Sequence, residues 1–158
     1  MRLSVREARR EDLRDILEII NRSFNEWDKH WAVQGLNHTK VFIAETEERN
    51  LAGFVETYVT RVEKVGKIGV IYYIAVKPEY RHKGVGRSLV FKAEEYFRLR
   101  KAIFSTASTK YDNLASRLLF KSMGYKELLV THNPGPVVER LIKALYAYED
   151  DIIFYKRL

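Results

Sequence analysis

A long apolar strand followed directly by a glycine turn and a helix limits this chain to few folds. The run Val70-Ile-Tyr-Tyr-Ile-Ala-Val76 has almost no polar interruption, so it predicts a strand that is covered on both faces and central in a sheet. Pro78 ends the strand because proline lacks the N–H that a sheet requires. Apolar residues at helical spacing then predict a long amphipathic helix to about Leu99, with Val85, Leu89, Ala93, Tyr96 and Phe97 on one face.

Shorter strands and helices alternate along the rest of the chain. We expect strands at residues 2–8, 40–45, 51–60, 102–107, 125–130 and 151–155. Asp12 and Asp112 are predicted caps of two helices, with Leu13, Ile16, Leu17 and Ile20 on the buried face of the first and Leu114, Leu118 and Leu119 on that of the second. Gly124 is placed to end the latter in a left-handed cap, and a further helix is expected at 137–145. This order predicts an α/β or α+β fold: a mixed sheet flanked by helices, in a single domain over residues 1–158.

Composition narrows the class of protein. The 158 residues carry 28 Lys plus Arg and 21 Asp plus Glu, a net charge of +7, which favours an anionic partner. No cysteine is present, so disulfides, thiolate metal sites and a cysteine nucleophile are excluded. No signal peptide and no apolar stretch of roughly 18 residues is visible, so we expect a cytoplasmic protein without membrane contact.

The glycine turn has the chemistry of an anion site. Gly84 and Gly86 allow close backbone approach, and the first N–H groups of the following helix lack partners. Positive side chains surround the turn: Arg81, His82, Lys83 and Arg87. A third glycine and a Gly-Lys-Ser/Thr sequence are both missing, which excludes two common nucleotide motifs. The segment therefore suits a pyrophosphate of another kind, or is a glycine turn with solvated basic side chains.

Arg-x-x-Gly-x-Gly after a strand that ends in Val-x-Pro resembles the cofactor motif of the GCN5-related N-acetyltransferase (GNAT) family. A second segment, from Asn113 to Gly124 and Tyr125, resembles the later helix of that family. The resemblance implies a GNAT-like mixed, mostly antiparallel sheet flanked by helices. The resemblance implies that the turn amides hold the pyrophosphate of acetyl-coenzyme A and that the backbone of Ile74 and Val76 pairs with the pantetheine arm. The cofactor-binding residues it implies are Ile74, Ala75, Val76, Arg81, His82, Lys83, Gly84, Val85, Gly86, Arg87, Ser88, Asn113 and Phe120. Asn113 is equally well explained as a helix-start residue.

Catalytic groups are harder to assign. The family transfers acetyl groups by direct attack of an amine, but Phe120 stands where many members have a tyrosine acid, and Val70 where some have a glutamate base. Nearby candidates are Tyr72 and Tyr73, whose hydroxyls should face opposite sides of a strand, and Glu56 on the preceding strand; each also has a purely structural explanation. No metal is expected.

The acceptor is not specified by the sequence. The resemblance implies acetyl-CoA and a primary amine as partners: a protein N-terminus, a lysine or a small amine. The run Glu149-Asp150-Asp151 beside Tyr146 and Tyr148 either attracts a cationic amine or forms a solvated turn, and Trp27 and Trp31 either line the acceptor groove or pack internally. The rival function is a non-catalytic acyl-CoA sensor. Nucleic acid is disfavoured because the tyrosines form no RNA-binding motif. Members of the family often pair, so a homodimer is compatible with the resemblance.

Overall fold

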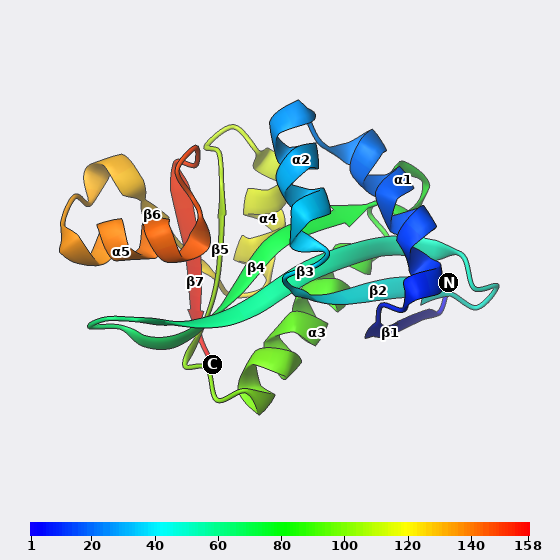
Figure 1. The fold of residues 1–158 in the computed structure, drawn as a ribbon, viewed down its shortest axis with the longest axis horizontal. Coiled ribbons are helices and arrows are strands. Elements are labelled where there is room, and N and C mark those ends of the chain that lie inside the picture. The colour runs from blue at the N-terminus through cyan, green and yellow to red at the C-terminus, as the bar shows by residue number, and fades with distance from the viewer. The chain divides into compact units, whose positions relative to one another are not determined.

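The computed structural model describes residues 1–158 and contains seven strands in the sheet order β1-β2-β3-β4-β5-β7-β6 (Figure 1). The strands are β1 (Leu3–Glu7), β2 (Lys40–Thr46), β3 (Leu51–Val62), β4 (Gly66–Val76), β5 (Phe104–Thr109), β6 (Lys126–Leu129) and β7 (Ile152–Arg157). The helices are α1 (Leu13–Ser23), α2 (Glu26–Gly35), α3 (Val85–Leu99), α4 (Leu114–Ser122) and α5 (Pro136–Leu145). Neighbours pair antiparallel at β1–β2, β2–β3, β5–β7 and β6–β7, whereas β4 and β5 pair in parallel. The predicted mixed, mostly antiparallel sheet with β4 at its centre is confirmed.

Two compact units make up the chain. The first comprises Met1–Thr57 and Tyr72–Ala93, and the second comprises Tyr58–Ile71 and Glu94–Leu158. Strands β3 and β4 and helix α3 contribute residues to both units. The single domain over residues 1–158 stays a prediction. None of the helices has the length and apolar character that crossing a bilayer requires.

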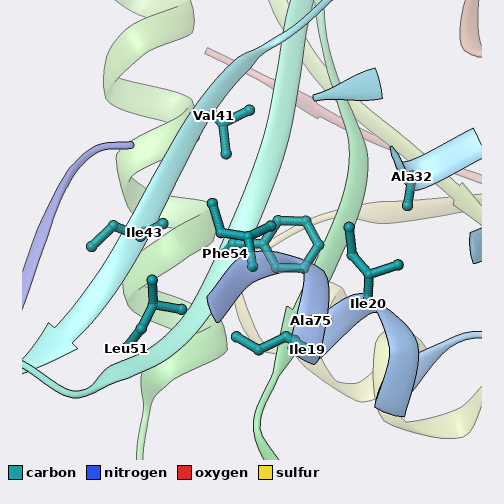
Figure 2. Close-up of a cluster of buried hydrophobic side chains, with 9 residues drawn as sticks. Ile19, Ile20, Ala32, Val41, Ile43, Leu51, Phe54 and Ala75 are labelled. Carbon is teal, nitrogen blue, oxygen red and sulfur yellow. The ribbon is translucent and has the colours of Figure 1, made fainter. Parts of the chain in front are cut away.

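The core of the first unit forms between α1, α2 and the strands β2 and β3. Ile19 and Ile20 of α1 meet Phe54 of β3, and all three side chains are buried (Figure 2). Full burial of a side chain of this size contributes about 1.5–3 kcal/mol. The predicted helical spacing is correct here, but Leu13 and Leu17 lie at the exposed border of the apolar face.

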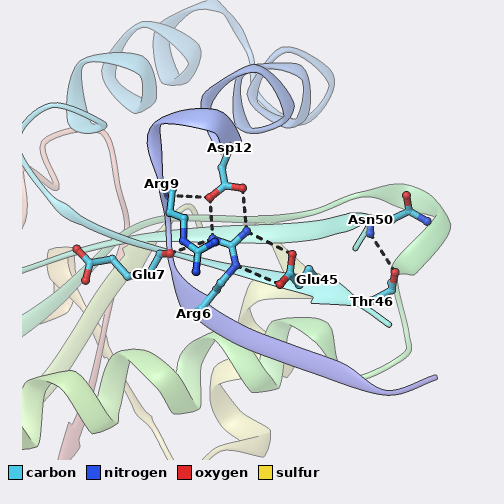
Figure 3. Close-up of polar contacts among 7 residues, drawn as sticks. All are labelled: Arg6, Glu7, Arg9, Asp12, Glu45, Thr46 and Asn50. Carbon is cyan, nitrogen blue, oxygen red and sulfur yellow. Dashed lines mark hydrogen bonds and ion pairs between the residues drawn. The ribbon is translucent and has the colours of Figure 1, made fainter. Parts of the chain in front are cut away.

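Arg6 joins three elements of the first unit through charged hydrogen bonds (Figure 3). Its Nη1 and Nη2 donate to the two carboxylate oxygens of Asp12 at 2.8 and 2.9 Å, and its Nε donates to Glu45 Oε1 at 3.1 Å. The predicted capping role of Asp12 is wrong in one respect: the residue precedes α1, but its side chain makes no cap hydrogen bond to that helix. Instead, the guanidinium of Arg6 holds the carboxylate and lowers the pKa of Asp12.

In the second unit, β7 lies between β5 and β6. Its residues pair with β5 from Phe104↔Arg157 to Thr109↔Ile152 and with β6 from Lys126↔Tyr155 to Leu129↔Ile152. β4 joins β5 in parallel from Ile68↔Phe104 to Val70↔Thr106.

Helix α4 uses a different face from the predicted one. Leu114 and Leu118 are 65% and 68% exposed, whereas Phe120 is buried and stacks on Phe154 of β7 with ring centroids 4.7 Å apart. The helix begins after Asn113, whose Oδ1 accepts from Ser116 N at 3.2 Å, so the predicted cap at Asp112 is wrong by one residue. Gly124 follows with φ +89°, as the predicted left-handed cap requires.

A buried glutamate organises the polar interior of the second unit. Glu94 of α3 is 2% exposed, and its carboxylate accepts from Tyr125 Oη at 2.7 Å and from Lys156 Nζ at 3.1 Å. The same hydroxyl lies 2.7 Å from Ser105 Oγ. Burial raises the pKa of Tyr125, so its hydroxyl remains a hydrogen-bond donor to Glu94. The network joins α3, β5 and β7 with its charges paired.

Two strand positions carry no side chain because α3 lies directly on them. In the first unit, a Cβ added to Gly53 would come 3.2 Å from both Val85 Cγ1 and Leu89 Cδ1 of α3, and 2.7 Å from Ala75 O. In the second unit, a Cβ on Gly69 would overlap the ring of Phe97. The glycines therefore fix the close approach of α3 to β3 and to β4.

Replacing Asp12 with Asn should reduce the free energy of unfolding by about 1–3 kcal/mol at pH 7, because Arg6 loses its charged acceptor. The folded-state pKa of Asp12 lies below its unfolded value, so this stabilisation is present above about pH 4 and is lost as the pH falls through the lower, folded-state pKa. Denaturant unfolding at pH 7 and at acidic pH measures both effects. Exposed Glu11→Gln is the control, and an equal loss for Asp12→Asn at every pH would contradict the assignment.

Glu94→Gln should lower the free energy of unfolding by about 1–3 kcal/mol, because Lys156 loses its buried counter-charge. Thermal or denaturant unfolding measures the change, with exposed Glu139→Gln as the control. A Glu94→Gln protein as stable as the wild type would show that the buried ion pair contributes no net stability.

Candidate active site

The turn between β4 and α3 folds back onto the strand that precedes it. Lys77 N donates to Ala52 O at 2.8 Å, directly after the last residue of β4. Arg81 Nε donates to the carbonyl of Val76 at 3.2 Å, which holds the turn against the strand end. Two residues of the turn have positive φ, His82 at +61° and Gly84 at +84°. The conformation at His82 was not predicted, although histidine is among the residues enriched there.

This backbone has the features of an anion site. The first hydrogen bond of α3 runs from Ser88 N to Gly84 O at 3.1 Å. The amides of residues 85–87 therefore have no hydrogen-bond acceptor within the helix. Turn residues with φ of changing sign direct neighbouring N–H groups toward one concave point. The side chains of Arg81, His82, Lys83 and Arg87 are exposed, which leaves them accessible to an anionic ligand.

Several predicted cofactor residues offer only their backbone. Val85 and Ala75 are buried in the first unit, so their side chains belong to its packing. Ile74, Val76, Gly86 and Ser88 are partly exposed. A Cβ added at Gly84 would meet nothing within 4 Å, so glycine serves the left-handed conformation there and leaves the backbone open. Residues 74–76 and 81–88 are all in the first unit.

Asn113 and Phe120 belong to the second unit, and their predicted contact with the cofactor stays a prediction. Asn113 Nδ2 donates to Thr109 Oγ1 at 3.0 Å while its Oδ1 caps α4. Phe120 packs against Phe154 and Tyr125. In this structure the contacts of both side chains lie within the second unit.

The three candidate catalytic residues lie together beneath α2. Tyr73 Oη donates to Asp28 Oδ1 of α2 at 3.0 Å. A Cβ added to Gly35 of α2 would overlap Glu56 Oε1 and lie 3.1 Å from Tyr72 Cε2. The rings of Tyr72 and Tyr73 are 4.7 Å apart between centroids, and both approach α2. The two rings therefore lie close together on the α2 side, and the predicted opposite orientation of the two tyrosines is wrong.

Glu56 is an unusual group in this cluster. It is fully buried, and neither of its carboxyl oxygens has a hydrogen-bond partner. Burial alone raises the pKa of Glu56 to about 9, so the side chain is a neutral acid at pH 7. Sequence reasoning named Glu56 but missed Gly35 and Asp28, since no local pattern indicates which α2 residues meet the strands.

The outer face of α2 is aromatic. Trp27 and Trp31 are 58% and 39% exposed, with ring centroids 5.9 Å apart, and His30 packs edge-on to Trp31 at 4.9 Å. These rings are surface residues, which does not fit internal packing. Their place in an acceptor groove stays a prediction.

The acidic run lies in the second unit and is partly occupied by local contacts. Asp150 Oδ2 accepts from Ser108 Oγ at 2.6 Å, and Asp151 Oδ2 accepts from Tyr111 N at 2.8 Å. These bonds fix the turn before β7 and fit the structural explanation of the run. Tyr146 and Tyr148 are exposed beside it.

The comparison with known families shows which family the chain belongs to. A sequence profile described as Acetyltransferase (GNAT) family matches residues 5–125. The chain belongs to this family. It is 24% identical over 153 residues to an uncharacterised N-acetyltransferase of Methanocaldococcus jannaschii, a match covering 87% of this chain and 67% of that relative. Membership makes the chain an acetyl-CoA-dependent acetyltransferase, as the resemblance implied.

Solved structures have the same fold. An acetyltransferase of the GNAT family from Staphylococcus aureus Mu50 matches with a TM-score of 0.74 and 14% identity, covering 99% of both chains. The ribosomal-protein-S18-alanine N-acetyltransferase of Escherichia coli matches with a TM-score of 0.70 and 20% identity, covering 99% of this chain and 94% of that one. The predicted GNAT-like fold is confirmed.

Gly84→Ala should weaken acetyl-CoA binding about tenfold or more, because its methyl group would occupy space that the turn leaves open. Gly124→Ala is the matched control: its φ of +89° imposes similar backbone strain, and its nearest neighbour atom would be 3.9 Å away. Calorimetric titration of both folded variants makes the comparison. Equal affinities for acetyl-CoA would remove the turn from the cofactor site.

Proposed function

We propose that this GNAT acetyltransferase transfers the acetyl group of acetyl-CoA directly to a primary amine. The observation that carries the proposal is the segment 74–88, where open turn amides, a helix N-terminus and basic side chains are built into one unit. Such a segment suits the pyrophosphate of the cofactor. The chain has no cysteine to hold an acetyl group, which favours direct attack by the amine over a cysteine-linked acetyl-enzyme.

In this proposal the turn residues bind and orient the donor. The amides around Gly84 and Gly86 hold the pyrophosphate, while Arg81, Lys83 and Arg87 balance its charge. The backbone of Ile74 and Val76 pairs with the pantetheine arm. Catalysis then rests on positioning the two substrates and on polar groups directed at the thioester oxygen.

The acceptor side is proposed to be the polar cluster under α2. Asp28, Tyr72, Tyr73 and Glu56 supply acidic and phenolic groups suited to a primary amine, and the exposed tryptophans of α2 suit an apolar neighbour of that amine. Protein N-termini, lysines and small amines are the three acceptor classes. The E. coli enzyme named for its ribosomal-protein alanine acceptor supports testing protein N-termini first.

Acetyl-CoA titration followed by acceptor-dependent thiol release tests this function. Three acceptor pools separate the classes: peptides with a free N-terminus and blocked lysines, peptides with a blocked N-terminus and free lysines, and small polyamines. We expect saturable acetyl-CoA binding, thiol release with one pool, and one acetyl group added to that acceptor by mass spectrometry. Binding without release from any pool would favour a non-catalytic sensor, and absence of binding would overturn the proposal.

A further inference from the structure

Two glutamates are fully buried in this molecule, and they differ in their surroundings. Glu94 in the second unit meets Tyr125 and Lys156, so its charge is compensated. Glu56 in the first unit has no hydrogen-bond partner on either oxygen. Leaving a buried carboxyl without a partner destabilises the folded state. An apolar residue of similar volume would pack better at this position. The carboxyl of Glu56 therefore points to a functional role.

The elements around Glu56 do not offer it a compensating charge. On β2, Lys40 bonds to Glu7 at 2.9 Å. On α2, Asp28 accepts from Tyr73 and His30 is exposed against Trp31. On β4, Tyr72 is half-buried, and its ring lies against the same point of α2 as the carboxyl of Glu56. Tyr72 therefore lies beside the buried carboxyl and is the more exposed of the two side chains.

Tyr72 also places this pair close to the expected chemistry. It lies two residues before Ile74 on β4, the strand whose backbone is proposed to pair with the cofactor arm. Both Glu56 and Tyr72 are in the first unit, together with the turn at residues 81–88. Gly35 leaves room for them, because any side chain there would collide with Glu56.

We infer that Glu56 is the final acceptor of the proton released by the attacking amine, with the Tyr72 hydroxyl passing it on. The inference rests on the acetyl transfer proposed above. The amine nitrogen forms a bond to the thioester carbonyl carbon, and the carbon–sulfur bond breaks to release the CoA thiolate. For this step the Tyr72 hydroxyl turns to donate to the ionised carboxylate of Glu56, with which it makes no hydrogen bond in this structure. The amine proton then moves to the Tyr72 oxygen as the Tyr72 proton moves to that carboxylate. The proton then returns by the same route to the thiolate, which regenerates the starting state.

This arrangement makes the reaction depend on alkaline pH. Glu56 accepts a proton only when ionised, and its pKa is raised to about 9, so the active fraction grows as the pH approaches that value. An α-amino acceptor loses its own proton at about pH 8. Because the two ionisations lie close together, the ionisation of Glu56 is identified by comparing the pH profile of kcat/KM for the wild type with that for Glu56→Gln.

Glu56→Gln is the decisive variant, because glutamine imitates the neutral acid in shape but cannot accept the proton. With an α-amino peptide, we expect kcat to fall about 10²–10⁴-fold, Tm to stay within about 3 °C, and the KM for acetyl-CoA to change little. The wild-type profile should rise to a break near pH 9, and this break should be absent in the variant. Tyr72→Phe should lower kcat to a similar extent.

Glu94→Gln is the matched control, since it neutralises the other buried glutamate and should lower Tm while leaving kcat per folded molecule unchanged. Wild-type kcat in Glu56→Gln, or a wild-type profile without a break near pH 9, would overturn the inference. If Glu56→Gln fails to fold, the wild-type profile and Glu56→Asp, which keeps a carboxyl and should retain the alkaline break, decide the matter. A failure of the proposed function differs, because wild-type protein would then acetylate no amine at any pH.

Discussion

The direct contact of α3 with two strands is the constraint on which the arrangement of this molecule depends. At Gly53 the backbone of β3 touches the start of the helix, and at Gly69 the backbone of β4 touches its later turns. Because interiors are close-packed, even one methyl group at these contacts must displace a neighbour. The start of α3 is also the end of the basic turn. The contact at Gly53 thus sets the position of the proposed pyrophosphate site within the first unit.

The polar interior shows two ways of burying an acid. Around Glu94, a lysine and a phenol donate hydrogen bonds to the carboxylate, which joins three elements of the second unit. Around Glu56, compensation is missing and the group stays neutral. A compensated acid fixes structure, whereas an uncompensated acid keeps a proton equilibrium that a substrate can shift. Burial alone therefore does not indicate the role of either residue.

Much of this fold and part of the site could be predicted from the sequence. The order of strand, Pro78, arginine and glycines defined the turn and the family, since each of these residues has a local backbone effect. The buried face of α4 could not be predicted in the same way. Leu118 has the spacing of a buried position, but periodicity does not say which face of the helix meets the sheet. The grouping of the Tyr72 and Tyr73 rings does not follow from the alternation of side chains that the sequence predicts. Partners far apart in the sequence, such as Arg6 and Glu45, leave no local pattern.

The position of β7 has a consequence for how the second unit is made. β7 follows β5 and β6 in the chain, yet it supplies a hydrogen-bonding partner to both of them. Until it is synthesised, each of those strands has an open edge that could pair with another chain. No residue of the first unit follows Ala93 in the chain, so all of that unit is synthesised before β5, β6 and β7. Vectorial synthesis thus leaves β5 and β6 open to intermolecular pairing until residues 152–157 have been made.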